Sequence, residues 1–146
     1  MPPASSDTTP SPIARWLTWP YRLLMLLGAC AGFAAIWVVL AWSNDSQCGW
    51  MALLGALDVA WILRLSGWPA GTRRAMVGVV ATAGIIGLAN WWIIAVQLGA
   101  VLGFDPLESA LRLGLQHAWL LAQLANAPFD LAMIPLALIL AALTSR

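Results

Sequence analysis

The chain has 146 residues, of which 62% are hydrophobic and only 9% are charged, and its net charge at neutral pH is +1. Soluble domains carry about 25% charged residues, so a soluble fold would be unable to cover this much apolar surface, and we expect lipid to surround the chain. The near-neutral balance leaves no basic patch for phosphates and argues against a nucleic-acid partner. Composition therefore predicts an all-α integral membrane protein, a small bundle of four to five hydrophobic helices with short loops.

The N-terminal residues, 1–14, are rich in Pro, Ser and Thr and predict a disordered cytoplasmic tail, whereas residues 15–146 read as a single transmembrane helical domain. The first expected span, residues 22–42, contains Gly28 and Gly32. Glycines four residues apart let a second helix backbone approach closely. We therefore predict a close helix contact at these glycines; the alternative is a chance match in a span rich in Gly and Ala.

Polar residues interrupt the next two expected spans. Residues 50–66 form a short span with Asp58 at its centre, and residues 75–102 form a longer one without a formal charge. Asn90 and Gln97 lie almost two helical turns apart in the longer span, so they face the same way. Because polar side chains are costly in lipid, this face should contact other helices or water.

The C-terminal third has two possible arrangements. Residues 107–126 form a helix whose polar residues recur at a spacing close to 3.6, and residues 130–144 form a last, short apolar helix. The polar residues of the first helix are Glu108, Arg112, Gln116, Gln123 and Asn126. We favour a spanning helix that turns this stripe into the bundle. A helix lying on the membrane surface, usually rich in Lys and Arg, is the alternative.

Arginines give the expected orientation. The five arginines of the first 102 residues all lie on one side of the first three spans, at Arg15, Arg22, Arg64, Arg73 and Arg74. The loop after the first span, which holds Cys48, and the loop after the third contain no Lys or Arg. Loops that face the cytoplasm carry an excess of Lys and Arg. We therefore predict a multi-pass protein of a bacterial-type inner (plasma) membrane, with its N-terminus cytoplasmic and Cys48 outside.

Asp58, Asn90 and His117 lie near the centres of three different expected spans. Ionisable residues in a bilayer are costly and often functional, and an Asp–His pair suits proton transfer. These three residues and Gln97 are therefore candidate binding residues along a polar path at mid-membrane depth. The alternative is a hydrogen-bonded cluster that only holds helices together. No motif typical of a catalytic, nucleotide or metal site occurs, so no catalytic residue or metal is predicted and no cofactor is named.

The sequence predicts function only in outline. Trp91 and Trp92 are suited to stacking on a lipid, a quinone or another apolar ligand, although packing against small residues is the simpler explanation. Our first hypothesis is a non-enzymatic, small polytopic protein that acts through helix–helix association, as an accessory subunit of a membrane complex or a homo-oligomer. Its packing faces would be the small-residue pairs Gly28–Gly32 and Gly99–Gly103. A small transporter or channel is the second hypothesis, and a membrane enzyme acting on lipid is a third that lacks a motif.

Overall fold

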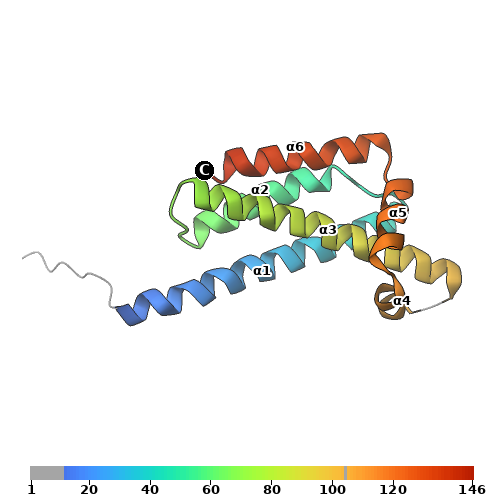
Figure 1. Cartoon of the computed structure of the whole chain (residues 1–146), viewed down its shortest axis with the longest axis horizontal. Helices are drawn as coiled ribbons and strands as arrows, with labels where there is room; N and C mark the ends of the chain where they lie inside the picture. The colour runs from blue at the N-terminus through green and yellow to red at the C-terminus, as the bar shows by residue number, and fades with distance from the viewer. Residues whose placement is uncertain (1–11, 104) are drawn as a thin grey trace, which may run out of the picture.

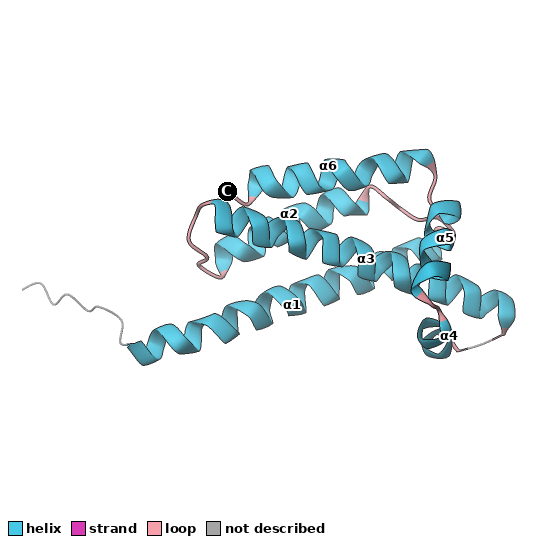
Figure 2. Cartoon of the chain, viewed as in Figure 1, coloured by secondary structure: helices cyan, strands magenta, loops and turns pink. Residues whose placement is uncertain are grey.

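The computed structural model describes residues 12–103 and 105–146, apart from the side chains of residues 12–17, 115 and 125. Every regular element in this part of the chain is a helix (Figure 2). The helices are α1 (Pro12–Ser43), α2 (Met51–Leu65), α3 (Thr72–Leu102), α4 (Pro106–Arg112), α5 (Leu115–Ala125) and α6 (Pro128–Thr144). The all-helical prediction is confirmed for this part. Of the expected tail, residues 1–11 lie outside the described residues, and α1 begins directly after them.

Four helices form an up-and-down bundle (Figure 1). α2 and α3 lie side by side in the middle, and α1 and α6 pack on opposite sides of this pair. α1 and α3 run in one direction and α2 and α6 in the other, so the α2–α3 turn and the end of α6 lie together. We call this the arginine end, because Arg22, Arg64, Arg73 and Arg74 lie there. The opposite end of the bundle holds α4 and α5 (Figure 1).

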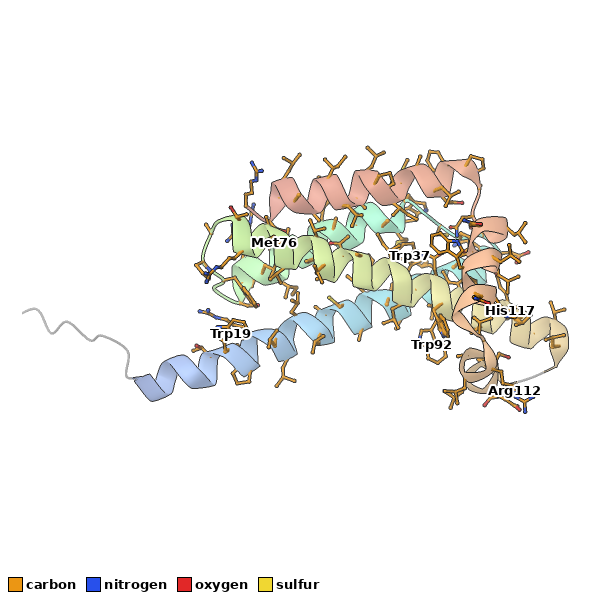
Figure 3. The ribbon with its side chains drawn as sticks, in the orientation of Figure 1. Trp19, Trp37, Met76, Trp92, Arg112 and His117 are labelled. Carbon is orange, nitrogen blue, oxygen red and sulfur yellow. The ribbon has the colours of Figure 1, made fainter. Side chains whose placement is uncertain are left out.

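Alanines occupy several of the helix contacts inside the bundle, and many large apolar side chains lie on its outside. Ala56, Ala89 and Ala137 are fully buried on α2, α3 and α6. By contrast, Val80 is 71% exposed and Trp61 is 66% exposed. Figure 3 shows apolar side chains projecting outward along all four helices of the bundle. Small residues at the contacts let the helix backbones approach closely.

Two of the described helices are long and apolar enough to cross a membrane, namely the Thr18–Ser43 part of α1 and the whole of α3. The bent pair formed by Gln116–Leu124 and Pro128–Thr144 would add a third only if it were one broken span. α2 and α6 have 15 and 17 residues. They are shorter than the roughly 20 residues that cross a bilayer core. The structure therefore contains two candidate spans where the sequence predicts four to five.

The single helix expected over residues 107–126 is instead two short helices. α4 ends at Arg112, the backbone at Leu113 and Gly114 is extended, and α5 then begins. Glycine inside a helix costs about 1 kcal/mol relative to Ala. The break also lets Leu113 bury its side chain in a cluster with Ile94 of α3. Neither piece is long enough to cross a membrane alone, and the chain bends by 112° between α5 and α6.

Candidate functional site

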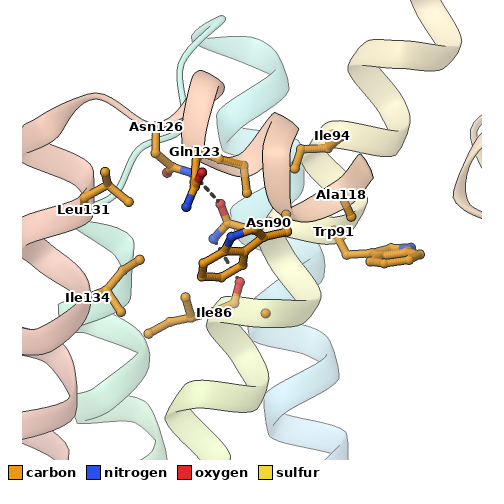
Figure 4. A pocket seen from close by; sticks show the side chains of 12 residues that line it. Ile86, Asn90, Trp91, Ile94, Ala118, Gln123, Asn126, Leu131 and Ile134 are labelled. Carbon is orange, nitrogen blue, oxygen red and sulfur yellow. Dashed lines mark hydrogen bonds between the residues drawn. The ribbon is translucent and has the colours of Figure 1, made fainter. Parts of the chain in front are cut away.

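Two amide side chains meet where α3 passes α5. Asn126 caps the end of α5. The helix does not continue, because Pro128 holds the preceding residue, Ala127, in an extended conformation. Asn126 Nδ2 donates hydrogen bonds to Oδ1 of Asn90, at 3.1 Å, and to the carbonyl oxygen of Ala122, at 2.6 Å. Asn90 Nδ2 donates to the carbonyl oxygen of Ile86 at 2.9 Å (Figure 4). Asn90 therefore faces a neighbouring helix rather than open surface.

A pocket of about 360 Å³ opens beside this amide pair, between α3, α5 and α6 (Figure 4). We call it the amide pocket. Its polar lining consists of Asn90, Gln123 and Asn126. Its apolar walls include Ile86, Trp91, Ile94, Trp119, Leu131 and Ile134. Small-molecule sites typically measure roughly 300 to 1,000 Å³ and combine apolar walls with a few placed polar groups, so this pocket is the candidate site.

Asp58 lies at a different level of the bundle from Asn90. Gly55 of α2 faces Ile85, and Leu63 faces Gly78, so Asp58 lies level with α3 near residue 82, before the centre of that helix. Asn90 follows that level by eight residues, about 12 Å along the helix. Asp58 is half-buried near Cys30 of α1 and makes no hydrogen bond to another described residue. From the mid-span positions of these residues we predict that Asp58 approaches Asn90 or His117, directly or through one water. The described residues form no direct hydrogen bond of this kind.

Gln97 and His117 line two further hollows. Gln97 lies beside Val101 and Leu124, and His117 is exposed on α5 beside Arg112. Figure 3 places His117 and Arg112 together at the end of the molecule remote from Trp19. Each of the four polar residues that the sequence singles out thus has its own surroundings, and within the described part of the chain they do not share one cavity.

The four glycines expected at helix contacts have different surroundings. Gly28 and Gly32 are exposed on α1, and a Cβ at either would meet no atom within 4 Å. They make no close contact within the described chain, so none of the described helices packs at this pair. Gly99 is buried, and Gly103 ends α3 in the left-handed conformation, with φ of 74°. Glycine adopts that conformation without steric cost.

Sequence reasoning missed a structural role for Arg74. Its buried guanidinium donates to the carbonyl oxygens of Trp68, at 3.3 Å, and Ser145, at 2.8 Å, and also to the main-chain oxygen of Arg146. It therefore fastens the end of α6 to the α2–α3 turn. The sequence shows only an arginine beside another arginine, and nothing local indicates that two of its three acceptors lie 71 and 72 residues away.

Asp130 makes a second long-range contact that the sequence did not reveal. Its Oδ1 accepts a hydrogen bond from the backbone N–H of Gly49 at 2.9 Å, and its Oδ2 accepts one from the N–H of Ala127 at 3.3 Å. The carboxylate thus joins the start of α6 to the loop between α1 and α2. Its position in the first turn of a helix was a visible signal, because carboxylates stabilise helix N-termini.

The residues and geometry define an all-helical bundle with two candidate membrane spans and an apolar pocket edged by amides. Comparison with models of protein families, with curated proteins and with solved structures finds no match. The function is therefore inferred from the pocket and from the exposed surfaces of the described residues.

Proposed function

We propose that this chain is a multi-pass protein of a bacterial-type inner membrane that acts through helix–helix association. In this proposal α1, α2, α3 and α6 lie in the bilayer, and the outer face of α1 binds a second copy of the chain or another membrane protein. The observation that carries the proposal is the open face of α1 at Gly28 and Gly32, where a Cβ would meet nothing within 4 Å.

The small residues of α1 continue this face beyond the two glycines. Ala31 and Ala35 are also exposed, and they are spaced like Gly28 and Gly32, four residues apart. In the most apolar window of α1, 17% of the residues are buried inside the chain, against 39% for α3. Of the two candidate spans, α1 is therefore the one less covered by other parts of the described chain. Small residues four apart on a lipid-facing helix favour close packing with another helix.

Asp58 gives independent support to association. A carboxyl group within the apolar part of a bilayer costs a few kcal/mol unless it pairs with another polar group. Asp58 is only half-buried on α2 and lacks a hydrogen-bond partner among the described residues. A neighbouring chain that supplies a donor would remove this cost.

The orientation proposed for the bundle follows from its charged ends. The arginine end would face the cytoplasm, in agreement with the excess of Lys and Arg in cytoplasmic loops. Asn90 lies sixteen residues beyond Arg74 on α3, about 24 Å along the axis. A hydrocarbon core is about 30 Å thick, so the amide pocket would lie in the outer half of the bilayer, and α4 and α5 would lie at its outer surface.

A transporter or channel is the alternative from the sequence. It would require Asp58, Asn90, Gln97 and His117 to line one path. Asp58 lies about 12 Å from the level of Asn90, and the other two residues line separate hollows. No observation favours this alternative over association.

Gly28→Leu tests the association directly. A Cβ at Gly28 would have open space around it, so the fold should survive while a neighbouring helix is pushed away. We expect about a tenfold loss of the associated chain, equivalent to about 1.4 kcal/mol. Affinity capture from native membranes in polymer nanodiscs, with mass spectrometry of every captured chain, measures this loss.

Gly84→Leu is the matched control for that experiment. Gly84 is an exposed glycine of α3 whose Cβ would also meet nothing within 4 Å. It should leave the captured complex unchanged. Equal capture by wild type and Gly28→Leu, or capture of a single isolated chain in every case, would contradict the proposal.

Membrane topology can be tested by thiol labelling at positions more exposed than Cys48. Cys48 is only 8% exposed, so it is a poor target for a thiol reagent. We expect Ser43→Cys, in a background with Cys30→Ala and Cys48→Ala, to react with an impermeant maleimide from outside the inner membrane. Thr72→Cys, exposed at the arginine end, should react only after that membrane is opened. The reverse pattern would invert the proposed orientation.

A further inference from the structure

The amide pocket has unused hydrogen-bonding capacity. Both hydrogens of Asn126 Nδ2 are donated within the protein, to Asn90 and Ala122, whereas its Oδ1 accepts no hydrogen bond from a described residue. Asn90 Nδ2 donates one hydrogen, to Ile86, and keeps the other. The Gln123 amide also lines the pocket and makes no hydrogen bond within the described chain. The pocket therefore offers both donors and acceptors to a ligand.

The lining of the amide pocket restricts the charge of that ligand. Among the described residues that line it, Asn90, Gln123, Asn126 and the Trp91 and Trp119 indoles carry the polar groups, and all of them are neutral. Burying an ion beside apolar walls without a counter-charge is strongly unfavourable. The matching ligand is therefore neutral, with an acceptor and a donor at one end and an apolar body for the isoleucine and leucine walls.

We infer that the amide pocket binds a neutral glycerolipid, with one acyl chain against the apolar walls and the ester carbonyl and a free glycerol hydroxyl at the amides. The ester carbonyl accepts from Asn90 or Gln123, and the hydroxyl donates to Asn126 Oδ1. Delivery of this lipid from the bilayer rests on the proposed membrane location. The pocket itself does not depend on the association face, because Gly28 and Gly32 do not line it.

Gly87 provides a way to fill the pocket without disturbing the chain. It lines the amide pocket on α3, and a Cβ there would meet no atom within 4 Å. Gly87→Leu should therefore occupy the space of the acyl chain. Gly84→Leu, one turn earlier and outside the pocket lining, is the matched control, since its Cβ also has open space.

The test is photolabelling of the purified full-length chain in phosphatidylcholine nanodiscs. The probe is a monoacylglycerol with a diazirine in its acyl chain, and mass spectrometry identifies the labelled peptides. We expect labelling around residues 86–94 and 118–134, a reduction of about tenfold in Gly87→Leu, and no change in Gly84→Leu. Unlabelled monoacylglycerol should compete, whereas a fatty-acid anion should not.

Gln123→Leu keeps the inference testable if Gly87→Leu misfolds. Gln123 is exposed on α5, so its replacement removes one amide without opening the core. It should lower labelling severalfold while helical content by circular dichroism stays unchanged. Equal labelling of wild type and both variants would overturn the site. Stronger competition by a quinone, or by the fatty-acid anion, would overturn the ligand class. Because association is read from Gly28→Leu, failure of the lipid site and failure of association are distinguishable.

Discussion

Arg74→Leu should produce one of the largest losses of stability in this chain. Arg74 is 9% exposed, and its guanidinium donates to three main-chain oxygens, two of them at the end of α6. A hydrogen bond from a charged donor contributes about 1.5 to 3 kcal/mol, and water will replace part of it once α6 is released. We expect a loss of roughly 3 kcal/mol, measured as unfolding in mixed detergent and denaturant micelles.

Arg73→Leu is the control for this substitution. Arg73 is the neighbouring arginine on α3, has the same charge and is exposed. Removing it should change stability by less than about 0.5 kcal/mol, as surface substitutions usually do. Similar losses from both substitutions would show that charge at this end of the bundle matters, and not the three hydrogen bonds of Arg74.

Gly49→Ala should have an effect of similar size at the opposite end. A Cβ at Gly49 would lie 2.7 Å from the Cα of Asp130, a backbone atom that is unable to move alone. The loop would have to shift, and the hydrogen bond from Gly49 N–H to Asp130 would break. Overpacking costs about 1 to 3 kcal/mol, and the lost hydrogen bond adds to it. Thermal unfolding by circular dichroism in detergent measures the change.

Gly84→Ala should shift stability in the opposite direction. A Cβ at Gly84 meets nothing within 4 Å, and Ala is better than Gly inside a helix by about 1 kcal/mol. A melting temperature that falls for Gly49→Ala and rises for Gly84→Ala supports the packing described here. A fall of equal size in both variants would contradict this packing, because a Cβ at Gly84 should meet no neighbouring atom and should not destabilise the helix.

The all-helical fold could be predicted from the sequence because it depends on composition and on long apolar runs. The break at Gly114 is harder to predict, since glycine is only a weak local signal and the other reason is tertiary: Leu113 gains a buried place beside Ile94 of α3. The contact between Arg74 and the end of α6 was equally out of reach. Local patterns give no information about which distant carbonyl oxygens a side chain will meet.

The separation of Asp58 from Asn90 has a simple geometric cause. Sequence reasoning placed the centres of all spans at one depth. α3 has 31 residues and α2 has 15, so the centre of α3 lies beyond the level of Asp58. Asn90 therefore meets Asn126, a residue that the sequence assigned to a polar stripe but not to a partner. The residue types of the site were visible in the sequence, whereas their pairing was set by helix lengths.

Site-specific photocrosslinking from the outer face of α1 tests the central claim most directly. Ala35→Cys and Val80→Cys, each exposed, would carry benzophenone maleimide in a background with Cys30→Ala and Cys48→Ala. In native membranes, we expect a protein–protein product from position 35, identified by mass spectrometry, and lipid adducts from position 80 on α3. Lipid adducts alone from position 35 would contradict the claim that this face of α1 binds another helix.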